Sequence, residues 1–382
     1  VVHRLLTTMG AASVIALAIP VMGGGSGSGS AKLPQRIGKP EGSLVLLEWP
    51  GYSHPSFAAD YEQETGCKIT RRDVASSADM VELMRRGPYD LVSASGDVSG
   101  QLIARRYVQP MNVKLVPQWR QLAPTFRSPA ANTVGGVHYG VTVMWTPNEL
   151  LYRTDARGPT PVSWRAVYDD RFHGKVSVPD NPMQIADAAL YLKSRTPKLG
   201  IRDVYELTPR QFDAATALLR RQAPLVKRYW QYASEQILDF RTAAAVVGSS
   251  WPYQRQVLLA ADVPVSRRVP REGATAWADS WLLAKQARHP NCAYLWMRHV
   301  LAADVQASQS LLLRESPVNP LACPIMDATE GGSCAAYYGS APAALLKRLV
   351  FWKAPAARCG YGGRTDCVPY KRWQRAWANV VG

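Results

Sequence analysis

Aromatic, hydroxyl, amide and acidic side chains follow the predicted strands of this chain at the points where the strands end. These residues are Trp49, Tyr52, Ser95, Asp97, Asn181, Gln184, Trp251, Trp277 and Asp279. In an open parallel sheet, ligands bind just outside the carboxyl ends of the strands. Aromatic faces attract a desolvated cation, and an acid supplies its counter-charge. The set predicts recognition of a small polar ligand, although each residue alone also fits a helix cap or a core ring.

The sequence lacks the motifs that would turn this set into an active site. It has no G-x-S-x-G nucleophile elbow, no G-x-x-x-x-G-K phosphate loop and no H-E-x-x-H zinc motif. The six histidines, at positions 3, 54, 138, 173, 289 and 299, show no metal-ligand spacing. We therefore expect a binding protein without cofactor or metal, and we keep a secreted hydrolase as a less favoured alternative.

The segments that must position these side chains alternate between strands and helices. Strands are predicted at 43–49, 68–72, 90–93, 140–145, 150–152, 175–178, 243–247 and 280–284. Helices are predicted at 56–65, 77–86, 98–106, 184–192, 209–220, 292–303 and 343–349, and one begins at Tyr253. Such alternation predicts an α/β fold whose parallel sheet is covered on both faces.

Size and charge exclude several classes of protein. A chain of 382 residues with 47% hydrophobic residues predicts two or three lobes with real cores, which excludes disordered and multi-span membrane proteins. The net charge is +16, but the basic doublets are scattered among apolar residues without interleaved aromatics. They are Arg71–Arg72, Arg85–Arg86, Arg105–Arg106, Arg220–Arg221 and Arg267–Arg268. We therefore expect no nucleic-acid partner.

Residues 1–30 differ from the rest of the chain. An early cation precedes an almost uncharged apolar stretch at 5–22, and a Gly/Ser segment follows at 23–30. This order is typical of a secretory signal peptide and linker. We expect a periplasmic or extracellular protein, with an uncleaved membrane anchor as the alternative for this segment.

The cysteines agree with export to an oxidising compartment. Their number is six, with no C-x-x-C pair. Cys323 and Cys334 flank one Gly-rich turn and Cys359 and Cys367 flank another, so each pair is typical of a local loop closure. Six cysteines allow fifteen pairings, and the connectivity stays open at this point.

Fragments along the chain together resemble a known family. They are LVLLEWPGY at 44–52, FAADYEQETGCK at 57–68, YDLVSAS at 89–95, the segment 139–145, Ser163–Trp164 with FHGK at 172–175, PREGATAWADSW at 270–281 and the segment 291–299. In this order, the chain from residue 43 to 382 resembles the extracellular solute-binding proteins of ABC importers, most closely the spermidine/putrescine-binding branch. The resemblance implies a protein that binds a small molecule and delivers it to an ABC permease in the membrane.

The family fold is the type II periplasmic-binding-protein fold, in which two α/β lobes close on a ligand cleft around a hinge. The resemblance implies a first lobe of residues 43–144 with 278–320 and a second of 145–277 with 321–382. It also implies a monomer, and a disulfide between Cys67 and Cys292 beside the two local pairs. A protein that signals to a membrane receptor would use the same cleft and stays as an alternative.

The resemblance also assigns site residues. The family's ligand-binding positions fall on Trp49, Tyr52, Ser95, Trp277 and Asp279. Asn181 and Gln184 stand where polyamine-binding members have carboxylates, Trp251 lies near the position of a stacking ring, and Lys353 replaces an amide. Burying an ammonium group without a counter-charge costs several kcal/mol. We therefore expect a small organic cation or zwitterion that is polyamine-like, amino-acid-like or a conjugate, with Asp279 as its main counter-charge and Asp97 as a further acid.

Overall fold

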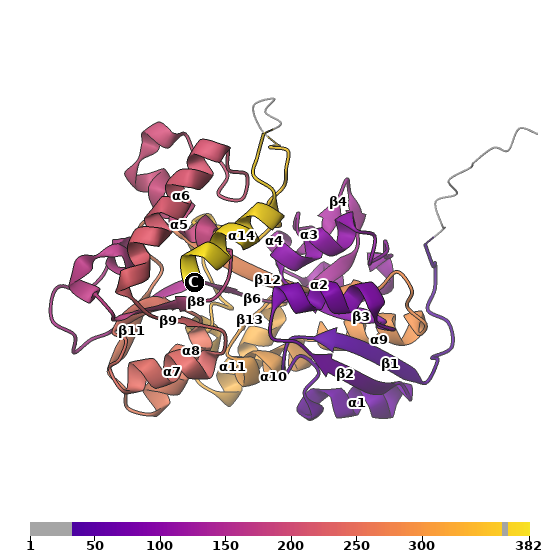
Figure 1. The fold of residues 1–382 in the computed structure, drawn as a ribbon. Coiled ribbons are helices and arrows are strands. Elements are labelled where there is room, and N and C mark those ends of the chain that lie inside the picture. Colours follow the sequence, from indigo (N-terminus) through magenta and orange to yellow (C-terminus); the bar gives the residue numbers. More distant parts are fainter. Residues whose placement is uncertain (1–32, 361–365) are drawn as a thin grey trace, which may run out of the picture. The chain divides into compact units, whose positions relative to one another are not determined.

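Two separate β-sheets organise the chain (Figure 1). This computed structural model describes residues 33–360 and 366–382, and the predicted signal and linker lie outside them. Within these residues, the first sheet has seven strands: β1 (Ser43–Glu48), β2 (Lys68–Asp73), β3 (Leu91–Ala94), β6 (Gly140–Pro147), β12 (Ala274–Leu283), β13 (Ser316–Pro317) and β14 (Leu349–Phe351). The second sheet has five: β7 (Glu149–Arg153), β8 (Val176–Pro179), β9 (Val226–Trp230), β10 (Val247–Ser250) and β11 (Val265–Arg268). The short strands β4 (Thr133–Val134) and β5 (Val137–His138) form a hairpin.

Helices connect and cover the strands. The α-helices are α1 (Pro55–Thr65), α2 (Ser77–Arg86), α3 (Gly96–Ala104), α4 (Pro124–Arg127), α5 (Gln184–Arg195), α6 (Pro209–Gln222), α7 (Ala233–Arg241), α8 (Pro252–Ala260), α9 (Pro290–Val300), α10 (Ala303–Leu313), α11 (Cys323–Thr329), α12 (Ser333–Ala336), α13 (Ala343–Leu346) and α14 (Tyr370–Val381). Short 3₁₀ turns are η1 (Val113–Leu115), η2 (Pro117–Gln121), η3 (Trp164–Tyr168), η4 (Asp170–Phe172), η5 (Pro197–Leu199), η6 (Ala223–Leu225) and η7 (Pro320–Ala322). None of the described helices is long and apolar enough to cross a membrane.

The strand β1 explains why the first sheet is covered on both faces. Its side chains alternate, so Leu46 belongs to the core cluster that includes Phe57 of α1, while Leu47 belongs to the cluster that includes Met80 of α2. β1 pairs in parallel with β2 and β3. The predicted strand–helix alternation of residues 43–104 is confirmed in order, with element ends shifted by one or two residues.

The central strand β12 corrects a prediction. The sequence predicts a strand at 280–284, but β12 begins at Ala274, and all ten of its residues are buried. It pairs antiparallel with β3 and β6 on its two sides. Trp277 and Asp279 interrupt the apolar run in the sequence, and pairing with β6 keeps this segment extended. The strand predicted at 243–247 is likewise wrong in its limits, because β10 begins at Val247.

The chain changes from the first sheet to the second just after Pro147 and returns just before Ala274. Each change of sheet lies within six residues of a predicted lobe limit, at 144/145 and 277/278. β14 returns to the first sheet beside the start of β12. The lobe limits of 43–144 with 278–320 and 145–277 with 321–382 stay a prediction.

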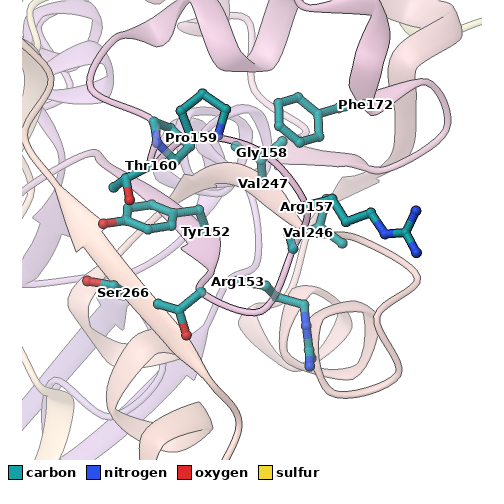
Figure 2. A pocket seen from close by; sticks show the side chains of 13 residues that line it. Tyr152, Arg153, Arg157, Gly158, Pro159, Thr160, Phe172, Val246, Val247 and Ser266 are labelled. Carbon is teal, nitrogen blue, oxygen red and sulfur yellow. The ribbon is translucent and has the colours of Figure 1, made fainter.

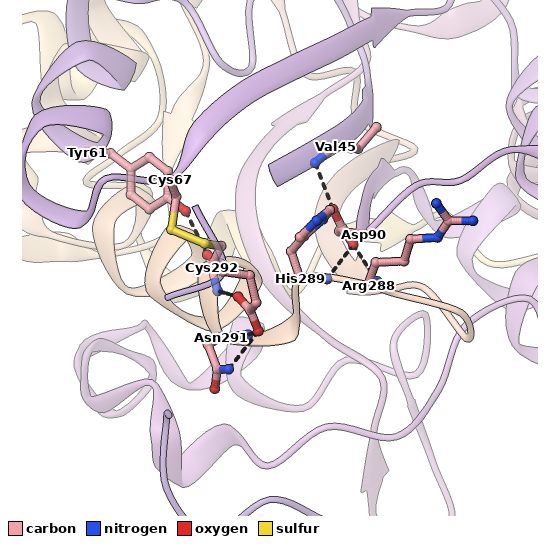
Figure 3. Close-up of polar contacts among 9 residues, drawn as sticks. Val45, Tyr61, Cys67, Asp90, Arg288, His289, Asn291 and Cys292 are labelled. Carbon is pink, nitrogen blue, oxygen red and sulfur yellow. Dashed lines mark hydrogen bonds and ion pairs between the residues drawn. A yellow bond between two sulfur atoms is a disulfide. The ribbon is translucent and has the colours of Figure 1, made fainter. Parts of the chain in front are cut away.

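Three disulfides are formed as expected, namely Cys67–Cys292, Cys323–Cys334 and Cys359–Cys367. The first joins the start of β2 to α9 across a separation of 225 residues, with the Cα atoms 5.9 Å apart (Figure 3). Nearby, the buried Asp90 accepts hydrogen bonds from the backbone N–H groups of Val45, Arg288 and His289. Strand and late helix are therefore held together by both covalent and polar contacts.

The C-terminal segment crosses back to the first sheet. At Gly96, the first residue of α3, a Cβ atom would lie 1.8 Å from the carbonyl oxygen of Trp352, so only glycine permits this approach. Farther along, α14 packs against α6 through one face that buries Trp373 and Trp377. This segment brings Tyr370 to the N-terminal turn of α3.

Candidate functional site

One face of β12 carries three of the groups that organise the site. Thr275, Trp277 and Asp279 are separated by two residues each, so their side chains point to the same face of the sheet. Trp277 and Asp279 were predicted to lie beyond a strand end. The structure instead places them inside a strand, paired with Thr146 and Met144 of β6, which fixes their positions more firmly than a loop would.

Tyr52 joins two carboxyl groups at one end of this face. Its hydroxyl lies 2.6 Å from Oδ2 of Asp279 and 3.0 Å from Oε2 of Glu315. Burial raises the pKa of Asp279 to about 7, and hydrogen bonding from Tyr52 and Ser95 offsets only part of that rise. Burial and the charge of Asp279 raise the pKa of Glu315 well above its usual value. Neither carboxyl has a cationic partner among the described residues.

Glu315 was not predicted to belong to the site. It follows α10 and immediately precedes the two-residue strand β13, which pairs with β6. No apolar run marks so short a strand, and Tyr52 is 263 residues away in the sequence. Its acidic type, next to Ser-Pro and after an apolar helix, is the only signal that the sequence offers.

Asp97 is fully buried in the first turn of α3. It accepts a hydrogen bond of 3.2 Å from the hydroxyl of Tyr370. Burial raises its pKa, whereas backbone N–H groups at the start of the helix lower it. The charge of Asp97 also raises the pKa of Asp279, so the two acids lie in one electrostatic environment. Asp97 thus combines the predicted acidic position with the alternative role at a helix N-terminus.

Another acid, Asp187 of α5, lies at the opposite end of the β12 face from Asp279. It accepts hydrogen bonds from the hydroxyl of Thr275 and, at 2.7 Å, from the amide of Gln184. Burial raises its pKa to about 7. The sequence analysis identified Gln184 in this helix but missed Asp187, which lies one helical turn later on the same side.

A hydrogen-bonded chain extends this end of the site to the second sheet. The indole N–H of Trp251 donates to Asn148 at 3.1 Å, and the amide of Asn148 donates to Thr275 at 2.7 Å. The Trp251 ring meets the Trp277 ring edge-on, with centroids 5.8 Å apart. Trp251, Trp277 and Gln184 are therefore brought together as expected from their positions beside the strands.

The remaining predicted residues have other contacts. Lys353 makes ion pairs with Asp203 at 2.7 Å and Glu206 at 2.6 Å, so its charge is compensated. The side chain of Asn181 accepts a hydrogen bond from the backbone N–H of Met183 and shapes the turn before α5. Trp49 donates its backbone N–H to Ser93 and packs partly buried against two core clusters.

Two cavities lie away from these residues. One, of about 130 Å³, is bordered by β7, the turn at 154–161 and Phe172 (Figure 2). The other, of about 290 Å³, lies beside the ends of α2 and α3. Among the described residues, no group of His, Cys, Asp or Glu side chains has the arrangement of a metal site.

Comparison with protein families identifies the group to which the chain is related. The family model described as bacterial extracellular solute-binding protein matches residues 56–325. The chain belongs to this family. The match includes Asp97, Asp187, Asp279 and Glu315, so the four acids described above lie inside the matched region, whereas Tyr52 lies just before it. Its members bind solutes, which agrees with the predicted class of protein.

Curated relatives and solved structures agree with this membership. The chain is 25% identical over 306 residues to the putrescine-binding periplasmic protein PotF of Escherichia coli, with 75% of this chain and 80% of PotF covered. It is 23% identical to a putrescine/agmatine-binding protein of Pseudomonas aeruginosa, over 75% of this chain and 80% of that protein. The structure superimposes on the spermidine/putrescine ABC transporter substrate-binding protein PotD of Streptococcus pneumoniae with a TM-score of 0.67 and 15% identity, covering 88% and 97% of the two chains.

These structural likenesses establish the fold. The solute-binding protein has the two-lobed α/β architecture of type II periplasmic binding proteins, as the sequence resemblance implied. The two sheets described above supply the α/β scaffold of this architecture.

The raised pKa values of Asp187 and Asp279 make the stability of the solute-binding protein depend on pH. Both carboxyls ionise near pH 4 in the unfolded chain but near pH 7 in the folded one, so the folded state binds more protons between these values. We expect their contribution to stability to fall as the pH rises from about 4 to about 7. Urea unfolding at pH 5 and pH 7.5 gives the free energy of unfolding of wild type and of the double variant Asp187→Asn/Asp279→Asn. The difference between the two proteins at each pH measures the contribution of the two carboxyls. A difference that does not change over this range would contradict the assignment.

Proposed function

We propose that this protein is the extracytoplasmic solute-binding component of an ABC importer and that it captures a small aliphatic diamine. The relatives named for putrescine and agmatine, and the PotD transporter component, support the class of function. The choice of ligand rests on one observation, namely that acids without a cationic partner lie at both ends of one face of β12. Asp279 and Glu315 lie at one end, and Asp187 lies at the other.

The spacing of these positions favours a ligand with a cation at each end. Thr275, whose hydroxyl donates to Asp187, lies four residues before Asp279 on β12. Four residues correspond to about 13 Å along a strand. Trp277 lies between them on the same face. An alkyl chain can pack on its ring while ammonium groups reach the acids from both ends, which is the arrangement that a diamine needs.

Structural details change the balance among the ligands expected from sequence. In the sequence, Asn181 and Gln184 replace two carboxylates and Lys353 replaces an amide. These changes favoured a ligand with one cationic end, such as a zwitterion. Asp187 supplies an acid one turn after Gln184, and Glu315 supplies another beside Asp279. Lys353 is compensated by two acids of its own. Together these contacts favour two cationic ends over a zwitterion.

Burial of the site supports the hinge motion implied by the family fold. Tyr52, Asp97 and Asp279 are each at most 3% exposed. A ligand can reach them only if the lobes separate, and closure afterwards excludes water and strengthens each charge pair. Because an ammonium group would favour the ionised carboxylates, we expect diamine binding near pH 7 to release protons.

Three ligands of similar length test the proposal by titration calorimetry. We expect 1,4-diaminobutane to bind more tightly than butylamine, which has one amine, and than 4-aminobutyrate, which replaces one amine by a carboxylate. In Asp187→Asn, the affinity for the diamine should fall at least tenfold, toward that for butylamine, because one charge pair is lost. Asp304 is exposed, so Asp304→Asn makes the same change of charge away from the site and serves as the control. This variant should bind the diamine as wild type does. Tighter binding of 4-aminobutyrate by wild type would contradict the diamine assignment.

A further inference from the structure

The ends of α2 and α3 enclose a pocket that the proposed transport function does not use. The two helices pack against each other, and the chain after β12 completes the pocket, whose volume is about 290 Å³. Its lining includes Arg85, Arg86, Arg105, Arg106, Lys285 and Tyr107. The two arginine doublets, about twenty residues apart in the sequence, are thus brought to one place.

The lining contains five cationic side chains and no carboxylate. Arg85 and Arg86 share one acid outside the lining, Glu82, at 2.6 and 3.2 Å. Arg105, Arg106 and Lys285 have no ion-pair partner in the described part of the chain, and all three are exposed. The pocket therefore carries a strong excess of positive charge.

Helix dipoles do not account for this excess. A helix C-terminus carries roughly half a negative charge, so the ends of α2 and α3 together contribute about one. Adding the carboxylate of Glu82 gives about two negative charges against five positive ones. About three positive charges stay uncompensated, which costs free energy through mutual repulsion unless an anion binds.

Backbone contacts fix the positions of the chain segments that carry these cations. Arg106 has φ of 58°, in the left-handed region where glycine or asparagine usually ends a helix. The backbone N–H of Lys285 donates to the carbonyl of Tyr107 at 2.8 Å, which joins the β12 end to the α3 end. At Gly87, a Cβ atom would lie 2.0 Å from the ring of Tyr89, so this ring forms a close wall of the pocket.

We propose that this pocket is a binding site for a phosphate-bearing anion. Guanidinium groups match phosphate oxygens with paired hydrogen bonds, and Tyr89 and Tyr107 also line the pocket. The volume lies close to the lower limit of about 300 Å³ for small-ligand pockets. The site has the opposite charge to the carboxylate site on β12, and it does not depend on the diamine proposal.

Charge-removing variants test the phosphate site. Inorganic pyrophosphate is titrated into the whole protein by calorimetry, and vesicles of phosphatidylglycerol or phosphatidylcholine are tested by co-sedimentation. Arg105→Gln/Arg106→Gln should weaken binding of the phosphate probe about tenfold or more, with a smaller salt dependence than wild type. The control is Arg220→Gln/Arg221→Gln, an exposed doublet on α6 with the same change of charge, which should change binding less than about twofold.

The two probes distinguish the source of the phosphate. Site-dependent binding of pyrophosphate identifies a free phosphate compound, and site-dependent binding of phosphatidylglycerol vesicles alone identifies a lipid headgroup. An equal loss in both doublet variants would show attraction by net charge only and would overturn the proposal. So would the absence of binding in both assays. An unchanged midpoint of urea unfolding in the variant checks that the protein is folded.

Discussion

Asp279→Asn should weaken binding of 1,4-diaminobutane by a factor of about thirty or more, because losing one partner of a buried charge pair costs about 2 to 5 kcal/mol. The same change should stabilise the ligand-free protein. The carboxyl of Asp279 is buried against Glu315 and Asp97 without a cation, so the neutral amide removes repulsion. Loss of affinity together with a gain of stability is the expected signature of a ligand counter-charge.

Calorimetry gives the affinity of this variant, and urea unfolding without ligand gives its stability. Asp304→Asn, an exposed acid in the first turn of α10, is the matched control and should leave the affinity unchanged and give no gain of stability. An unchanged affinity in Asp279→Asn would remove this residue from the binding site. A variant that loses both affinity and stability would instead indicate that Asp279 supports the fold through Tyr52.

Removing the disulfide between Cys67 and Cys292 should cause the largest loss of stability among the three disulfides. The bond closes a loop of 225 residues, and the chain-entropy relation gives about 5 kcal/mol for such a loop. The Cys359–Cys367 bond closes a separation of only 8 residues, which gives about 2.5 kcal/mol. We expect Cys67→Ala/Cys292→Ala to be roughly twice as destabilised as Cys359→Ala/Cys367→Ala.

Urea unfolding of both double variants under non-reducing conditions measures this difference. Both Cys67 and Cys292 are fully buried, so the alanine pair avoids adding a polar group to the core. If the long-range variant is the more stable of the two, the loop-entropy account fails. Should it not accumulate as a folded protein, a variant with both local pairs replaced by alanine keeps only the Cys67–Cys292 bond, and its midpoint with and without reductant measures that bond alone.

The strand and helix order of the first hundred residues could be predicted because local pattern decides it there. The apolar run that becomes β1 is bounded by Trp49 and Pro50, and α1 begins at Pro55 and ends at the left-handed Gly66. The cysteine pairs near the C-terminus and the family resemblance could also be recognised from sequence. The positions of Tyr52 and Ser95 after strands followed from this order.

The composition of the site depended on contacts that no local pattern contains. Asp187 and Glu315 were missed because the groups that bind them, Thr275 and Tyr52, lie 88 and 263 residues away. Trp277 and Asp279 were expected at a strand end, because polar and aromatic residues interrupt an apolar run. Pairing with β6 keeps the strand extended through them and turns both side chains to one face.

The electrostatic properties of the protein could likewise be predicted only in part from the sequence. The sequence by itself determined the net charge, the residue types and the class of solute-binding protein. Only the tertiary structure decided that Lys353 is compensated by Asp203 and Glu206, and that two separate arginine doublets share one pocket. The physical reason is that electrostatic energy depends on distance and burial, and both are set by the packing of segments remote in sequence.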